Sequence, residues 1–460
     1  MARTLGSLAV ACLFWCPPPV GAAVGGEPEP PIPNAADPVD YIAWMNAQLG
    51  AAIENNTWEL YRQISREIQP FPGDLGEALD GPWSENLAVR GWLAAQARPL
   101  AKFREAADGQ AAFQLQEPRP TGDARLDRLM VALPMPGLMS FTIATQALLA
   151  DGYYRWEKGE PERLTDNALV VLRAAHHLES CPWVLGRLLA ASIAAQAYQA
   201  LRNALSLSDD PDALAAKVLA GLEAADPPWS PITRTYLFEQ VTAWDFCQRV
   251  FVPGKGSSDW SLHGPVVDAL AAAKGSATWD REQREEIARI GFEKTLEEVD
   301  EYFDAVDRWC AKPWPWASRH VVDLNKRAVD SDNPLCRTLL PLLQRPRVVA
   351  LRAIADRRAT HLIFHIFAQR GRNGSFPWTL DQVEIVDLGE MRIDPFADEL
   401  FLYRRTGDEF LLFSRADNAR IDRVRHDPHW QTGDFVFWPV QQETTNSAEE
   451  RRTGSPASGP

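Results

Sequence analysis

The sequence predicts a mainly α-helical protein that ends in a small α+β module. The first observation is a series of Ala- and Leu-rich blocks with apolar residues at helical spacing, which continues to about residue 370. Short breaks rich in Pro, Gly and Asp separate these blocks, so neighbouring helices should run antiparallel as hairpins. After Arg392 the pattern changes to short aromatic runs on either side of a tight turn, which predicts strands.

The composition indicates a globular protein and argues against a nucleic-acid partner. Hydrophobic residues make up 46% and charged residues 24% of the 460 residues, and the formal net charge is -15. Binding to a phosphate backbone depends on clustered Lys and Arg, and the sequence has no basic stripe interleaved with aromatic residues. We therefore expect an unidentified protein or small molecule as the ligand, and no nucleic acid.

The first residues predict a secretory signal peptide over residues 1–23. Arg3 is followed by the apolar run "LGSLAVACLFWCPPPVGAA", which ends in small residues suited to cleavage after Ala22 or Ala23. A short membrane anchor is the alternative, but Pro17 to Pro19 interrupt the run and it is too short to span a bilayer. Cys12 leaves lipoprotein processing open. We expect an exported protein, periplasmic or extracellular, with no transmembrane helix after signal removal.

The rest of the chain divides into four predicted regions. A Pro-rich leader at 24–37 precedes an irregular all-helical domain at 38–345. An α+β module at 346–440 follows, with a long helix and a three-stranded antiparallel sheet, and 441–460 is predicted to be a disordered tail.

Two features of the helical domain are specific enough to test. Asp37 is predicted to cap a first helix that starts at Pro38 and continues to Ile68. The segment Ala147 to Leu178 resembles a tetratricopeptide-type helical hairpin. No repeat of fixed period follows it, so an array of such hairpins is not expected.

The C-terminal pattern predicts a helix that is covered on two sides. The run "VVALRAIADRRATHLIFHIF" is apolar over more than one face, so one face should pack on the helical domain and the other on the sheet. Thr406, Gly407 and Asp408 separate two aromatic runs and predict a hairpin, with "DFVFWPV" as a third strand. The residues expected to cover the helix are Phe396, Leu400, Leu402, Phe410 and Leu412.

Residues 346–440 resemble the globular module of the major pseudopilins of type II secretion. The resemblance rests on a long helix followed by "RNGSFPWTLDQV" and then by "IDPFADELFLYRRTGDEFLLFSRADN". Similar modules end other exported bacterial proteins. The chain has no prepilin leader and its module follows a large helical domain, so assembly as a pilus subunit is not expected.

The resemblance also implies a candidate calcium site in the loop after the hairpin. Asp417, Asn418 and Asp422 offer the oxygen donors that Ca²⁺ prefers. The glycines of the family's loop are missing, however, and four arginines would repel the ion: Arg415, Arg420, Arg423 and Arg425. The alternative is a polar loop that closes the sheet.

His361 and His365 form the candidate zinc pair. Their i,i+4 spacing places both on one side of a helix, but no Glu lies between them and no third ligand is indicated. Structural histidines are therefore the main interpretation. Glu297, Glu301 and Asp304 similarly share one helical face, which is typical of a solvated acidic surface.

No complete catalytic set accompanies these residues, which favours a binding or scaffold protein over an enzyme. The alternative is a periplasmic or secreted hydrolase whose site is assembled from scattered residues, with His361, His365 and the acidic helix as its candidates. No cofactor is expected, and Ca²⁺ and Zn²⁺ are the only candidates. The remaining cysteines allow three disulfide pairings or stay free as small apolar residues: Cys181, Cys247, Cys310 and Cys336.

Overall fold

The structure is a computed structural model that describes residues 29–49, 53, 55–71, 85–115, 120–133, 137–256, 259–274, 279–386, 388–428, 430 and 433–441. The chain divides into a short unit, Met1–Pro31, and a main unit, Ile32–Pro460. The predicted signal peptide lies outside the described residues, and so do residues 24–28 of the leader and 442–460 of the tail.

The main unit is mainly α-helical with small antiparallel sheets, as the sequence predicts. Its first part contains α1 (Tyr41–Leu49), α2 (Trp58–Glu67), α4 (Leu87–Ala95), α5 (Ala97–Asp108), η1 (Met130–Ala132), α6 (Leu138–Glu157), α7 (Glu162–Glu179), α8 (Val184–Leu207), α9 (Pro211–Ala225) and α10 (Ile232–Val250). Its middle part contains α11 (Gly264–Lys274), α12 (Arg281–Ile290), α13 (Phe292–Cys310), α14 (Trp314–Val329) and α15 (Pro334–Leu339).

The prediction of one helix from Pro38 to Ile68 is wrong. Helix α1 begins after Asp40, whose Oδ1 accepts a hydrogen bond from the Ala43 N–H at 3.1 Å. Asn55 has a φ of 61°, which a right-handed helix cannot include. The Asn56 side chain then binds the backbone of Ala112 through both its oxygen and its nitrogen. Contacts that the local sequence does not reveal therefore separate α1 from α2.

The predicted hairpin of Ala147 to Leu178 is present as α6 and α7, and α7 packs in turn against α8. Gly152 explains the close approach of the first pair. A Cβ atom at this position would lie 2.9 Å from the Leu164 Cα, closer than a side chain allows. A short hairpin that was not predicted, β1 (Phe251–Pro253) and β2 (Trp260–Leu262), follows α10.

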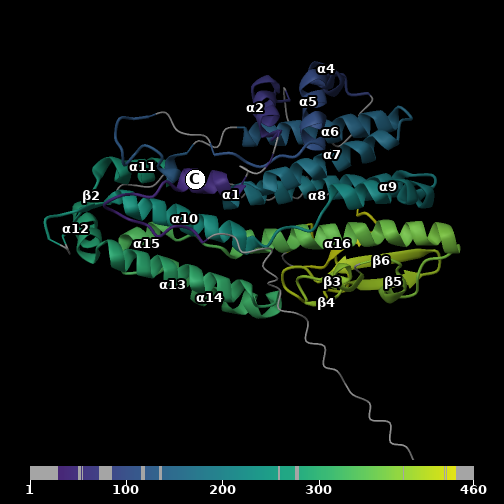
Figure 1. The fold of residues 1–460 in the computed structure, drawn as a ribbon. Helices are drawn as coiled ribbons and strands as arrows, with labels where there is room; N and C mark the ends of the chain where they lie inside the picture. The colour runs from purple at the N-terminus through teal and green to yellow at the C-terminus, as the bar shows by residue number, and fades with distance from the viewer. Residues whose placement is uncertain are drawn as a thin grey trace, which may run out of the picture. The chain divides into compact units, whose positions relative to one another are not determined.

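Helix α16 (Gln344–Asn373) is covered on two sides, as the sequence predicts. It contacts α8 and α9 on one side and β6 and β7 on the other, and Figure 1 shows it between them. Every residue from 359 to 369 is buried, which matches a helix that is apolar on more than one face. The helix is therefore shared between the helical region and the C-terminal sheet.

The C-terminal part contains η2 (Leu380–Gln382), α17 (Leu388–Met391), β3 (Ile393–Asp394), β4 (Glu399–Leu400), β5 (Leu402–Thr406), β6 (Glu409–Ser414) and β7 (Phe435–Trp438). Strands β5, β6 and β7 form the predicted three-stranded antiparallel sheet, in which Tyr403 pairs with Leu412. Phe396 is fully buried between Trp314 and Trp430, as expected for an aromatic beneath the sheet.

Two expectations for this module are wrong. Leu402 is half-buried and pairs with Phe413, on the face of the sheet opposite to Tyr403 and Leu412, which pack in the core. Leu400 is 41% exposed and does not cover the helix. It pairs with Ile393 in the separate β3–β4 sheet, and the next residue, Phe401, points inward and is only 2% exposed. Because side chains alternate along an extended chain, placing Phe401 inward turns Leu400 outward.

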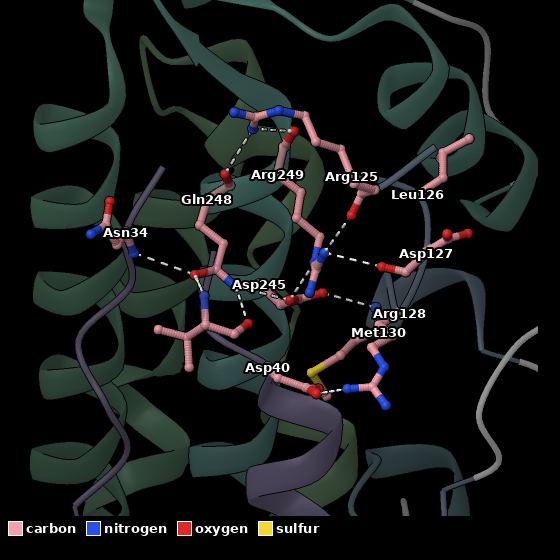
Figure 2. A network of polar contacts seen from close by, with 12 residues as sticks. Asn34, Asp40, Arg125, Leu126, Asp127, Arg128, Met130, Asp245, Gln248 and Arg249 are labelled. Carbon is pink, nitrogen blue, oxygen red and sulfur yellow. Dashed lines mark hydrogen bonds and ion pairs between the residues drawn. The ribbon is translucent and has the colours of Figure 1, made fainter. Parts of the chain in front are cut away.

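A buried polar network ties the end of α10 to two distant segments (Figure 2). Asp245 accepts hydrogen bonds from Arg249 at 2.7 Å, Gln248 at 3.0 Å and the Met130 N–H at 2.9 Å. Gln248 in turn binds the Val39 backbone, accepting from its N–H and donating to its carbonyl. These bonds fix the segments that precede α1 and contain η1.

Arg125 completes this network at the carboxyl end of α10. Its guanidinium donates to the carbonyls of Gln248, Arg249 and Phe251 at 2.8–3.1 Å, and also to Ala35. The last carbonyls of a helix have no partner within the helix, so a guanidinium from another segment satisfies them.

None of the described helices is long and apolar enough to cross a membrane. Four cysteines lie in the described chain, and all are free: Cys181, Cys247, Cys310 and Cys336. Burial raises the pKa of each thiol, so these residues act as small apolar side chains.

Candidate functional site

The carboxylate of Asp226 lies at the centre of a polar cluster that joins four helices. Asp226 follows the last residue of α9, and Pro227 and Pro228 prevent the helix from continuing. Its side chain is completely buried. Oδ1 accepts hydrogen bonds from His176 Nε2 on α7 and from the Tyr198 hydroxyl on α8, each at 2.8 Å, and Oδ2 accepts one from His361 Nε2 on α16 at 2.9 Å.

This environment favours the charged carboxylate. Burial by itself would raise the pKa of Asp226, but hydrogen bonds from His176 and His361 outweigh that effect and lower the pKa to about 2. Asp226 is therefore ionised throughout the physiological pH range.

His176 lies between two carboxylates. Its Nε2 is 2.8 Å from Asp226 Oδ1 and its Nδ1 is 2.8 Å from Glu179 Oε2. A neutral imidazole could donate to only one of them, so the cation is favoured. Burial alone lowers the pKa of His176, but the bonds to Asp226 and Glu179 raise it above its ordinary value.

Glu179 extends the cluster to the segment after Asp226. It forms an ion pair with Arg187, whose guanidinium also donates to the Ser230 carbonyl at 2.8 Å and lies 4.8 Å from the Trp229 ring. The Ser230 N–H donates back to Glu179 at 2.6 Å. A small cavity of about 100 Å³ adjoins His176, Glu179 and Arg187, and is too small for most organic ligands.

A larger cleft lies beside His361, the residue of α16 that binds Asp226. It has a volume of about 600 Å³, within the range of small-molecule sites. Four basic side chains from successive turns of α16 line it, together with residues from the end of α9 and the segment around α17. The lining residues are Glu223, Pro228, Arg357, Arg358, His361, His365, Glu384, Ile385, Val386, Glu390 and Met391.

The two arginines of the cleft are already engaged by the protein. Arg357 Nε donates to the Asp226 carbonyl at 3.1 Å, and its Nη1 lies 3.7 Å from the Met391 sulfur. Arg358 donates to the Ile393 carbonyl at 3.0 Å and forms an ion pair with Glu390. These contacts hold α16 against the segment around α17.

His365 lies one turn beyond His361 and has an incomplete set of partners. Its Nε2 lies 3.2 Å from Glu223 Oε1 but makes no hydrogen bond there or elsewhere among the described residues. Burial is the main cause that lowers the pKa of His365 to about 4, with the nearby His361 adding to it. The imidazole is therefore neutral at physiological pH.

The predicted zinc pair, His361 and His365, does line one cleft, as its spacing predicts. The two imidazoles have different partners, however, because His361 Nε2 is bound to Asp226 while His365 Nε2 faces Glu223. Across the part of the chain that the structure describes, no group of three His, Cys, Asp or Glu side chains is placed to hold a metal ion.

The candidate calcium residues do not converge. Asp417 forms an ion pair with Arg352 at 2.7 Å, whereas Asn418 donates to Asp422 at 2.6 Å. The carboxylate that organises this loop is Asp434, which the sequence did not single out. It is fully buried, and its Oδ2 accepts from the Asp422 and Val424 N–H groups at 3.0 and 2.8 Å.

The acidic helix is solvated, as the sequence indicates. Glu297, Glu301 and Asp304 on α13 are exposed. Two carboxylates of this stretch do have partners. Asp300 accepts hydrogen bonds from Gln240 and from the Trp244 indole, and Glu298 accepts one from Ser331. None of these carboxylates lines the cleft on α16.

The sequence did not identify Asp226, Tyr198 or Glu223 as site residues. It did not identify His176 either, whose sequence neighbour His177 binds the Tyr61 hydroxyl instead. The one local feature that marks Asp226 is its position at a helix end before two prolines.

Comparison of the chain with protein-family models, with curated proteins and with solved structures finds no match. Interpretation of the site therefore depends on its own geometry.

Proposed function

We propose that the protein is an exported binding protein for a small molecule, with the cleft on α16 as its ligand site. The observation that carries the proposal is a cleft of about 600 Å³ whose polar wall is held in place by the cluster around Asp226. A site whose side chains are fixed before binding loses little conformational entropy when the ligand arrives. The expectation of export comes from the predicted signal peptide.

The chemistry of the lining supports binding rather than covalent catalysis. Among the described residues that line the cleft, none carries a hydroxyl or thiol side chain that could serve as a nucleophile. Both arginines are held by neighbouring carbonyls and carboxylates, and His361 is only 2% exposed. This set can shape and orient a ligand without further chemistry.

A thermal-shift screen tests the proposal with a panel of amines, amino acids, sugars, carboxylates and nucleotides. Val386 lines the cleft and is 99% exposed, so Val386→Trp should fold normally while filling the cleft. Val322 on α14 is 56% exposed and lies outside the lining, which makes Val322→Trp the matched control. At least one class of compound should raise the melting temperature of the native protein and of Val322→Trp. The same compound should leave the melting temperature of Val386→Trp unchanged. If no compound distinguishes the two variants, the cleft is not a ligand site.

Hydrolysis is the second candidate function. The hydrogen bond between His361 and a fully buried, ionised Asp226 is the arrangement that orients an imidazole for general-base catalysis. Chromogenic esters, phosphates and glycosides would test it. Turnover that is lost in His361→Gln and retained in a variant outside the cleft, such as Val322→Trp, would favour this candidate over simple binding.

A further inference from the structure

We propose that the cleft binds a ligand that presents a primary ammonium group on an apolar body. This inference rests on the proposed binding function and specifies the ligand class. It starts from two neighbouring acceptors, His365 Nε2 and Glu223 Oε1, which lie 3.2 Å apart without a hydrogen bond between them.

The geometry explains why these two atoms do not bind each other, because Glu223 Oε1 lies away from the direction in which an N–H at Nε2 would point. His365 is 8% exposed, and its burial keeps the ring neutral at physiological pH. A neutral imidazole carries a single N–H, and we assign it to Nδ1, with the Glu384 backbone beside the ring as its acceptor. Nε2 is then a lone pair that faces a carboxylate oxygen, and a buried acceptor without a donor is unfavourable. A ligand that donates hydrogen bonds would satisfy both atoms.

The charges around the cleft favour a cation as that donor. Among the described residues, Glu390 is paired with Arg358, and Glu384 is paired with Arg372 at 2.9 Å. Arg357, the other cation of the lining, lies 3.7 Å from the buried Asp226 carboxylate. Among the described residues, the basic side chain within 4 Å of the Glu223 carboxylate is the neutral His365. Glu223 therefore keeps an uncompensated negative charge at the cleft, which attracts a cation and repels an anion.

An ammonium group fits this pair better than a metal ion does. The described residues supply only these two potential ligands at this point, and no group of three is available for a metal. A primary ammonium has three N–H donors, so it can bind His365, Glu223 and one water molecule. The remaining walls include Pro228, Ile385 and Met391, which would contact an apolar body.

The test is isothermal titration calorimetry of the full chain with butylamine, octylamine and phenethylamine at neutral pH. The comparison ligands keep the phenethyl body and replace the head group with trimethylammonium, hydroxyl or carboxylate. We expect at least one amine to bind. It should bind at least tenfold more tightly than its trimethylammonium analogue, which carries the charge but cannot donate.

Glu223→Gln should weaken amine binding by at least tenfold, because it removes the charge and keeps the shape of the side chain. The matched control is Glu105→Gln, which neutralises an exposed carboxylate on α5 outside the cleft, and it should bind as the native protein does. His365→Leu should also weaken binding, because it removes the second acceptor.

The inference is wrong if no amine binds, if the trimethylammonium analogue binds equally well, or if Glu223→Gln has no effect. Tighter binding of the carboxylate would also overturn it. In these cases the proposed binding function is judged separately, by whether any class in the thermal-shift panel is sensitive to Val386→Trp. An amine that binds equally to native protein and Val386→Trp is held elsewhere and likewise overturns the inference.

Discussion

Asp226 and Asp245 are both fully buried carboxylates that join segments far apart in the sequence, yet their surroundings differ. Asp245 binds Arg249, Gln248 and a backbone N–H in a network that fixes the end of α10 (Figure 2). Asp226 binds two histidines and a tyrosine, and one of those histidines lines the cleft on α16.

The two environments shift the carboxylate pKa in opposite directions. Burial raises the pKa of Asp245, and its hydrogen bonds do not fully offset that effect. Two histidine donors instead lower the pKa of Asp226 to about 2 despite its burial. The fold therefore favours the charge on Asp226 and tolerates the charge on Asp245. The favoured charge of Asp226 lies beside the cleft and supports the site that we propose, whereas Asp245 joins segments of the fold.

The largest expected effect is that of Asp226→Asn. A neutral amide would leave the His176 cation with only Glu179, and it would remove the charge that orients His361. Removing one partner of a buried ion pair costs about 3–5 kcal/mol, so we expect a loss of that size in the free energy of unfolding at pH 7. Urea denaturation measures it, with the m-value as a check on two-state unfolding. A loss below about 1 kcal/mol would contradict the favourable role of the Asp226 charge.

Lowering the pH should first protonate two histidines near the Asp226 cluster, His177 and His365. Burial lowers the pKa of His177 and His365 to about 4, whereas the unfolded chain binds those protons near 6.5. Between pH 6.5 and 4 the unfolded state thus binds more protons, so stability falls as the pH falls, by about 2–3 kcal/mol for each of the two residues. The labelled residues of the Asp245 network include no histidine.

The lowered pKa of Asp226 affects stability at a lower pH than the two histidines do. Its contribution is present above about 3.8 and is lost only as the pH approaches 2. A denaturation series from pH 8 to 4 therefore reports mainly on the histidines, and the double variant His177→Gln, His365→Leu should flatten it. An unchanged slope in this variant would show that other groups control acid unfolding.

Asp245→Asn should cost less than Asp226→Asn, about 1.5–3 kcal/mol at pH 7, because Arg249 loses a charged partner but still donates to the carbonyls of Ala124 and Asp127. Burial raises the pKa of Asp245, so the fold favours its charge less than water does. The amide oxygen can still accept hydrogen bonds from Arg249 and Met130. The same urea denaturation compares the two variants directly. If Asp245→Asn lowers the free energy of unfolding more than Asp226→Asn does, the opposite pKa shifts of the two carboxylates do not indicate which network contributes more to stability.

Local pattern predicted the fold better than it predicted the site. Helical spacing and Ala and Leu content placed most helices, and Gly407 beside Asp408 placed the β5–β6 turn, because these properties act over a few residues. The break at Asn56 depends instead on a contact with Ala112. Asp226 lies 50 positions from His176 and 135 from His361, and no spacing rule connects such residues.

The candidate histidines also show that the sequence predicts local geometry but not distant partners. The sequence predicted that His361 and His365 share a face, and this is confirmed by their position in one cleft. It could not assign them different roles, because those roles depend on Asp226 and Glu223, which come from α9 and its end. The resemblance of residues 346–440 to pseudopilins stays a prediction, and so does export.

The smallest expected effect on stability is that of His365→Leu, which separates a binding residue from a structural one. Its Nε2 is a buried polar atom without a hydrogen-bond partner, so an apolar side chain of similar size removes an unfavourable group. The Glu384 backbone beside the ring belongs to an exposed residue and can bind water instead. We therefore expect the free energy of unfolding at pH 7 to change by less than about 1 kcal/mol, in either direction.

His361→Leu is the matched variant and should cost about 2–4 kcal/mol, because it removes a buried bond to the ionised Asp226. Equal losses in the two variants would make His365 a structural residue. Retaining an unsatisfied buried histidine costs stability, and the ligand that we propose would account for its presence by completing its hydrogen bonds.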